Sequence, residues 1–214
     1  MFDGLHGVTV YGVAHFQTLA CKMSLPSFIT HYFEFDKGPF RNICDLSDTQ
    51  LDSLISSEKH ARTAFNRFAL GTDFFKVRRA ADDLLIEKYT EKFGVSPQTR
   101  PFFAVLGNFD RTTTMYRDGR SLKIEIGSLA PEHLTFMYPD HFHLVWSKGL
   151  FTPDFPYSHQ PFHDLLFTYS ELPQAISDYR WDSLIDGAKQ RDMWTCSYVE
   201  AHIWDPDVIH KIQG

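Results

Sequence analysis

The stretch DFFKVRRAADDLLIEKYTEKFG, residues 73–94, constrains the fold of this chain more than any other segment. Five apolar residues recur there at every fourth position: Val77, Ala81, Leu85, Tyr89 and Phe93. This spacing predicts a long amphipathic helix with one apolar stripe, ended by Gly94. Arg78 and Asp82, like Arg79 and Asp83, have the spacing of surface ion pairs on such a helix.

The segments around this helix have the character of strands. SFITHYFEF (27–35) is rich in β-branched and aromatic residues, which predicts a strand. A helix over 48–59 is predicted from the capping box of Ser47 and Gln50. Strands are expected within 100–107, 112–129 and 133–146, with Asp118-Gly119 as a hairpin turn. A helix is expected over 170–189, with Pro173 in its first turn. Residues 197–212 are expected to form a final strand followed by a turn and a short helical segment.

The resulting order is strand, two helices, several strands, helix and strand, without regular βαβ alternation. We therefore expect one α+β domain over residues 25–214, with a mainly antiparallel sheet and flanking helices. Residues 1–24 are expected to be an N-terminal extension or peripheral segment. They lack the early basic residues of a signal peptide.

Composition narrows the class of protein. A net charge of −6, from 21 basic and 27 acidic residues, argues against a broad surface that coats nucleic acid. The three cysteines are scattered and form no CxxC pair, which favours a reducing, cytoplasmic setting. The sequence contains no run of about 18 apolar residues, so no membrane span is predicted. The 20 phenylalanines favour a well-packed core with an aromatic-lined cleft.

Histidines provide one candidate for chemistry. His141 and His143 would share one side of a strand, and His159 and His163 would share one face of a helical turn. With Asp140 or Asp164 these residues could hold zinc for a metal-dependent hydrolase. Because 11 histidines make chance pairs common, surface histidines are the alternative, and no metal is favoured. The GxSxG, dinucleotide-binding and P-loop motifs are absent from the sequence.

Two segments at the ends of the chain carry a resemblance. FITHYF (28–33) and YVEAHIWDPDVIHKI (198–212) resemble the two ends of an ADP-ribosyltransferase domain, most closely the toxin-type transferases that modify DNA. In that family an early strand carries a histidine, and a late strand carries the catalytic glutamate before a proline-containing turn. Glu200 occupies the corresponding place here, with Pro206 after it. The segment KIEIGSLAPEHLTFMYPDHF also resembles uncharacterised bacterial proteins.

The resemblance implies an α+β transferase that uses NAD to modify a macromolecule, nucleic acid or protein, in a toxin or defence context. Glu200 would be the catalytic residue, since a carboxylate below the ribose stabilises the cation that forms as nicotinamide leaves. His31 would position the ribose, Tyr32 or Tyr116 would stack on nicotinamide, and Arg41 would neutralise the pyrophosphate. Arg62, Arg67 and Arg78 are further candidates for that last task.

This hypothesis requires the first and last strands to lie side by side and to direct His31 and Glu200 into one hollow. Two alternatives remain open at this level. Glu200 alternates with Val199 and Ala201, as a solvated strand residue would, and His31 has the surroundings of a hydrogen-bonded core histidine. The chain would then be a non-catalytic interaction module.

Overall fold

The computed structural model describes residues 25–61, 66–151, 157–181, 198–208 and 210. Along the chain the main elements are β1 (Phe28–Glu34), α1 (Asp48–Glu58), α2 (Gly71–Phe93), β2 (Phe102–Leu106), β3 (Gly119–Glu125), β4 (Leu134–Met137), α3 (Phe142–Ser147), α4 (Leu172–Tyr179) and β5 (Glu200–Ile203). The predicted α+β class is confirmed, with every strand pair antiparallel. Residues 1–24, expected to be an extension, lie outside the described part.

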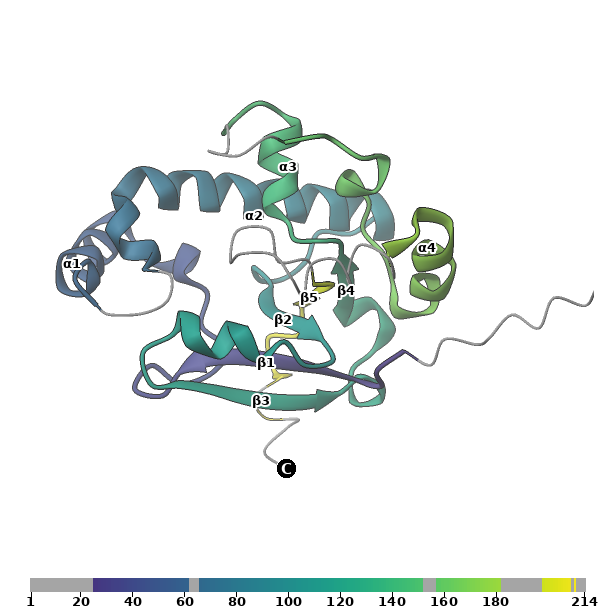
Figure 1. Cartoon of the computed structure of the whole chain (residues 1–214), viewed down its shortest axis with the longest axis horizontal. Helices are drawn as coiled ribbons and strands as arrows, with labels where there is room; N and C mark the ends of the chain where they lie inside the picture. Colours follow the sequence, from purple (N-terminus) through teal and green to yellow (C-terminus); the bar gives the residue numbers. More distant parts are fainter. Residues whose placement is uncertain (1–24, 62–65, 152–156, 182–197, 209, 211–214) are drawn as a thin grey trace, which may run out of the picture.

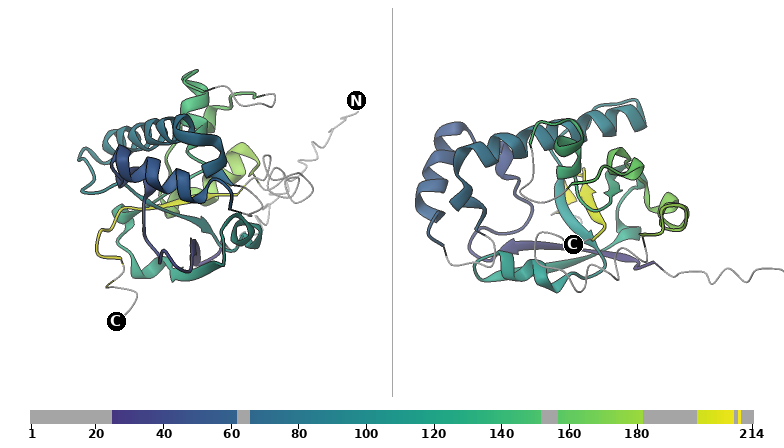
Figure 2. Two further views of the ribbon diagram at one scale, coloured as in Figure 1. Left: turned by 90° about the vertical axis from the view of Figure 1, so that its left-hand side faces the viewer. Right: turned by 45° about the horizontal axis from the view of Figure 1, so that its top comes forward.

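The five strands form one sheet in the order β3-β1-β2-β5-β4. Its two faces are covered by different elements, as Figure 1 shows: α2 runs along one side with α3 beside it, and α4 lies near the β4 end. Figure 2 gives two further views of this arrangement. Because β2 and β5 lie inside the sheet, side chains from both are buried on either face.

The two apolar clusters of the sheet follow the alternation of its strands. On the α2 side, Leu85 and Tyr89 pack with Met137 and Trp204. On the other side the cluster combines strand residues such as Ile29 and Ala201 with the α4 residues Leu172, Ala175 and Ile176. The apolar stripe predicted for 73–94 therefore does cover one sheet face, and Gly94 ends α2 in the left-handed conformation with φ 72°.

Local signals located the first helix correctly. The Ser47 hydroxyl accepts a hydrogen bond from the backbone N–H of Gln50, and the Gln50 side chain accepts one from the backbone N–H of Ser47. These two bonds satisfy donors that a helix start otherwise leaves unpaired. None of the helices in the described ranges has the length and apolar character needed to cross a membrane.

Two expectations for the middle of the chain were wrong. Asp118-Gly119 is not the turn of a local hairpin, because residues Asp110–Met115 form a 3-10 helix and β3 pairs with β1 instead. The 133–146 strand stops at Met137, and His143 belongs to α3. His141 and His143 therefore do not share one side of a strand.

Candidate active site

Glu200 is the centre of a buried polar cluster on the α2 side of the sheet. It is the first residue of β5, an interior strand, and only 5% of it is exposed. Its Oε1 atom accepts three hydrogen bonds: from the backbone N–H of His141 at 3.0 Å, from Nδ1 of His141 at 2.7 Å, and from Nε2 of His202 at 3.0 Å. Among the described residues, no hydrogen bond reaches Oε2. The hydrogen bonds that the described residues make to this carboxylate thus all go to one of its two oxygens.

A chain of hydrogen bonds fixes which nitrogen of His202 carries the proton. The indole N–H of Trp204 can only donate, and it donates to Oγ1 of Thr135 at 2.8 Å. The Thr135 hydroxyl can then donate its own proton to Nδ1 of His202, 3.2 Å away. The ionised Glu200 carboxylate, 3.0 Å from Nε2 of His202, can only accept, so Nε2 carries a proton and the Thr135 hydroxyl, as donor, leaves Nδ1 without one. Burial lowers the pKa of His202, which agrees with a neutral ring.

Asp82 of α2 lies on the other side of the His141 ring. This carboxylate is fully buried; it accepts hydrogen bonds from Nε of Arg78 at 3.0 Å and Nδ2 of Asn42 at 3.0 Å. Its Oδ1 also lies 3.3 Å from Nε2 of His141. The imidazole of His141 thus stands between two carboxylates, those of Asp82 and Glu200.

The pKa shifts follow from this arrangement. Burial alone would raise the pKa of Glu200, but His141 and His202 outweigh burial and lower it well below the ordinary range. Burial would lower the pKa of His141, but the Glu200 and Asp82 carboxylates raise it instead. The pKa of Asp82 is also depressed, since Arg78 and His141 outweigh its burial. Two carboxylates therefore face the Arg78 cation and a histidine whose charged form is favoured by both of them.

Aromatic and acidic groups border the cluster. The Arg78 guanidinium lies over the Phe103 ring at 4.2 Å, and that ring stacks on His141 at 4.5 Å. Asp140, the residue before His141, has a pKa raised to about 6 by burial and by the Glu200 charge. Burial, with the Asp140 and Glu200 charges, also raises the pKa of Tyr198. A carboxylate that titrates near neutrality therefore lies near one that stays ionised.

His141, Glu200 and His202 have the donor set of a metal centre, with one ligand atom from each within 4.8 Å of the others. Their hydrogen bonds favour a different state. The proton on Nε2 of His202 occupies the position that a metal would need, and Nδ1 of His141 lies only 2.7 Å from Glu200. The geometry therefore supports a hydrogen-bonded, ionised carboxylate.

His31 does not take part in this site, which overturns the expected juxtaposition with Glu200. Strand β2 lies between β1 and β5. Glu200 pairs with Val105, and Val105 pairs with Thr30, so Thr30 and Glu200 face the same side of the sheet. His31 follows Thr30 and so faces the opposite side, where it stacks on Phe40 at 4.7 Å.

His31 is a core histidine whose two ring nitrogens are both hydrogen-bonded. Its Nδ1 donates to the Phe103 carbonyl at 2.7 Å, and its Nε2 accepts from the backbone N–H of Phe40 at 3.0 Å. Burial lowers its pKa to about 4. Both nitrogens are thus used by the main chain, so His31 is withdrawn as a ribose-positioning residue.

The other sequence-predicted contacts lie in different places. Tyr32 faces the same side as Thr30 and Glu200, and its hydroxyl accepts a hydrogen bond from the backbone N–H of Phe109 at 2.8 Å. Tyr116 is half-buried, with the Arg67 guanidinium 5.0 Å from its ring. Arg41 is exposed on the segment after β1 and has no described contact with Glu200.

The histidine set predicted to hold one metal is divided between two places. His141 contacts Glu200, whereas His143 contacts His163 through their Nδ1 atoms at 3.1 Å. Sequence reasoning gave Asp82 only a surface ion pair with Arg78 and Asp140 only a role as a metal ligand, and it did not name His202. The sequence did carry a signal for His202. It follows Glu200 by two positions in the same strand, and residues two apart in a strand point to the same side.

Comparisons with protein-family models, with curated proteins and with solved structures found no match to this chain.

Proposed function

We propose that this chain is an ADP-ribosyltransferase-like enzyme that uses NAD as a substrate and Glu200 as its catalytic carboxylate. The observation that carries the proposal is the state of Glu200: buried on an interior strand, held ionised by three donors on Oε1, with Oε2 unbonded among the described residues. A solvated strand carboxylate would need none of these donors. The resemblance of the final segment singles out the same residue.

The chemistry requires a fixed negative charge beside the ribose. The bond between ribose C1 and the nicotinamide nitrogen breaks, nicotinamide leaves with the bonding electrons, and positive charge develops on the ribose ring. The Oε2 atom of Glu200 would accept a hydrogen bond from a ribose hydroxyl and stabilise that charge. Because His141 and His202 hold Oε1, the carboxylate needs no reorientation during the reaction.

A separate group is needed to take the proton of the attacking acceptor. Glu200 is a weak base because its pKa is depressed. Asp140, with a pKa of about 6, is better matched to proton transfer near neutral pH. We therefore assign charge stabilisation to Glu200 and proton acceptance to Asp140. The acceptor would be a macromolecule, nucleic acid or protein, in a toxin or defence context.

Arg78 is the residue best placed to bind the diphosphate of NAD. Its Nε is anchored on Asp82 and its planar group stacks on Phe103, so the remaining guanidinium nitrogens are held in a fixed orientation. Tyr32, on the Glu200 side of the sheet, and Tyr116 stay as candidates to stack on nicotinamide. Arg41 and His31 are replaced in the proposal by Arg78 and His141.

The test is release of nicotinamide from NAD by the purified full chain, with single-stranded DNA, RNA and a protein mixture as separate acceptors. Glu200→Gln preserves the shape of the side chain and should lower the rate at least about 100-fold. Glu125→Gln is the matched control, since Glu125 is an exposed glutamate on edge strand β3. The proposal fails if the wild-type chain neither binds nor cleaves NAD, or if Glu200→Gln keeps the full rate.

A further inference from the structure

Asn42 lies in the segment between β1 and α1, and its side-chain amide makes three hydrogen bonds. Only 7% of the residue is exposed. Its Oδ1 accepts from the backbone N–H of Cys44 at 2.9 Å, and its Nδ2 donates to the Pro101 carbonyl at 2.9 Å. A second bond from Nδ2 goes to Oδ2 of Asp82 at 3.0 Å. Because a backbone N–H only donates and a carbonyl only accepts, these partners fix the orientation of the amide.

A second asparagine shows which of these bonds the local turn requires. Asn66, like Asn42, caps a 3-10 helix, and its Oδ1 accepts from the backbone N–H of Phe68, two positions on, at 3.0 Å. Side-chain bonds of this kind stabilise the start of a turn. The described bonds from Nδ2 of Asn66 all end on backbone carbonyls within residues 58–61. The bond from Asn42 to the Asp82 carboxylate is therefore additional to what a cap needs.

Two arginines lie close to the Asp82 carboxylate. Nε of Arg78 donates to Oδ1 at 3.0 Å, and Nη1 of Arg100 lies 3.9 Å from Oδ2. That Nη1 atom is buried and has no hydrogen-bond partner among the described residues, so an acceptor would stabilise it. Asn42 occupies the same Oδ2 atom at 3.0 Å. The amide thus holds the carboxylate with Oδ1 directed to Arg78 and competes with Arg100 for Oδ2.

We propose that Asn42 is a positioning residue which, through Asp82, holds the Arg78 guanidinium in the orientation that binds the diphosphate of NAD. This assignment rests on the proposed function. Without the Asn42 amide, the Asp82 carboxylate can turn toward Arg100, and Nε of Arg78 then loses its anchor. The guanidinium still stacks on Phe103 at 4.2 Å, so it stays near its place but turns within its plane. A small change in the orientation of a substrate-binding group weakens its action.

The first experiment needs no NAD. NMR of the full-length, nitrogen-labelled chain follows how fast the Nε–H proton of Arg78 exchanges with water. Asn42→Ser keeps a capping hydroxyl for the backbone N–H of Cys44 and adds no charge, but its side chain is too short to reach Asp82. Because the Arg78 anchor is then loosened, we expect this proton to exchange about fivefold faster, the equivalent of one hydrogen bond.

The second experiment measures NAD cleavage by the same variants. Asn42→Ser should raise KM for NAD at least about fivefold while kcat falls less than about threefold. The reason is that His141 and His202 still hold Glu200 in place. In the Arg78→Lys background, Asn42→Ser should raise KM by less than about twofold more, since both changes act through one contact and are not additive.

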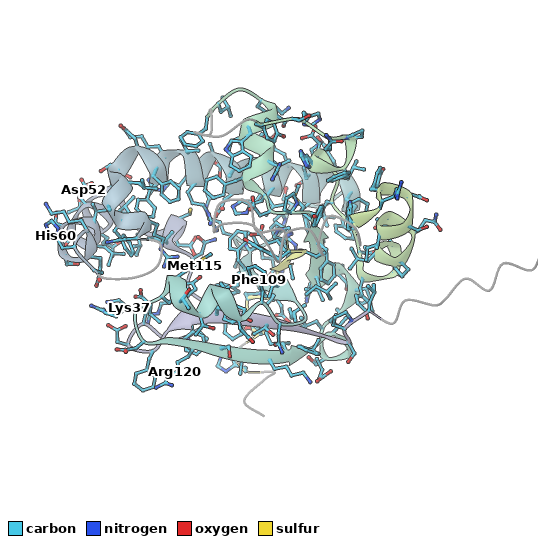
Figure 3. All side chains as sticks on the ribbon, in the orientation of Figure 1. Lys37, Asp52, His60, Phe109, Met115 and Arg120 are labelled. Atoms are coloured by element: carbon cyan, nitrogen blue, oxygen red, sulfur yellow. The ribbon has the colours of Figure 1, made fainter. Side chains whose placement is uncertain are left out.

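Asn66→Ser is the matched control, because it shortens a capping asparagine at the α1 end of the molecule, which His60 marks in Figure 3. It should change neither the Arg78 exchange rate nor KM. The inference is overturned if both serine variants affect Arg78 alike, or if Asn42→Ser raises KM equally with and without Arg78→Lys. If the parent chain neither binds nor cleaves NAD, the proposed function fails, and the Nε–H signal alone decides whether Asn42 positions Arg78.

Discussion

His141 donates two hydrogen bonds to the same oxygen of Glu200, one from its backbone N–H at 3.0 Å and one from Nδ1 at 2.7 Å. A loop residue and a strand residue 59 positions apart are thereby held in one orientation. Because Asp82 lies 3.3 Å from the other ring nitrogen, the imidazole is favoured in its charged form. The site is thus a set of alternating charges rather than a single buried acid.

Replacing Asp82 tests how far this charge alternation contributes to stability. Asp82→Ala leaves the Arg78 guanidinium without the buried carboxylate that its Nε contacts, and leaves His141 with Glu200 alone, so we expect a loss of about 3–5 kcal/mol in the free energy of unfolding. Asp83→Ala is the matched control, since Asp83 is exposed and contacts Arg100 at 2.6 Å on the surface of the same helix. Asp83→Ala should lower the free energy of unfolding, measured by urea denaturation, by only about 0–1 kcal/mol. Equal losses in the two variants would contradict the buried network.

The Thr135 hydroxyl is expected to stabilise the fold by pairing the buried side chains of His202 and Trp204. Thr135→Val keeps the shape but removes both the acceptor for Trp204 and the donor to His202, all three being buried. Leaving buried polar groups unpaired costs about 1–3 kcal/mol each, so unfolding free energy should fall by at least about 2 kcal/mol. Thr72→Val, at an exposed position on α2, should change it by less than about 0.5 kcal/mol. Nitrogen NMR of the His202 ring should show the Nε2–H form in both proteins, because the Glu200 carboxylate still accepts from Nε2, and should show a shifted Nδ1 resonance in Thr135→Val, because the hydrogen bond to Nδ1 is lost.

Local patterns predicted the elements of this fold well, because their causes lie within a few residues. The capping box of Ser47 and the left-handed Gly94 depend only on neighbours, and both were confirmed. The prediction of a hairpin turn at Asp118-Gly119 was wrong because β3 pairs along its whole length with β1, which is a longer partner than a local hairpin would offer. Pairing over long sequence distances is decided by burial of the whole sheet face, which no short window contains.

The site was only partly predictable for the same reason. Glu200 was identified, but its burial was not, since alternation in a strand does not say which face is covered. Arg78 and Asp82 do form the predicted pair, yet it is buried rather than on the surface, while Arg79 and Asp83 pair with other residues. A signal for Asp82 existed: it shares a helix face with Leu85 and Tyr89, three and seven positions on. A carboxylate within an apolar stripe needs a partner from elsewhere in the chain.

If the proposed function is correct, Arg78→Lys should weaken NAD binding more than it slows the reaction. Lysine keeps the positive charge but cannot hold Asp82, stack on Phe103 and bind a diphosphate at once. We expect KM for NAD to rise at least about tenfold with kcat reduced less than about threefold. Arg79→Lys is the neighbouring control, because Arg79 pairs with Asp48 and should leave both constants unchanged. A fall in kcat alone would remove Arg78 from the diphosphate site.

Buried neutral histidines should make the fold sensitive to mild acid. The pKa of His31 is lowered by burial to about 4, against about 6.5 in the unfolded chain. Between these two values unfolding takes up a proton, so the stability contribution of neutral His31 is full above pH of about 6.5 and is lost toward pH of about 4. Within this range, His31 alone changes the free energy of unfolding by about 1.4 kcal/mol per pH unit.

His31→Asn removes the titrating group, so its unfolding free energy should fall less steeply between pH of about 6.5 and 4 than that of the parent, by that amount. The variant is also expected to be less stable at neutral pH, because both ring nitrogens are hydrogen-bonded to the main chain. Urea denaturation at closely spaced pH values measures both effects. His60→Asn, at an exposed position, should retain the parental slope. Parallel curves for the parent and His31→Asn would mean that His31 is not the buried neutral ring described for β1.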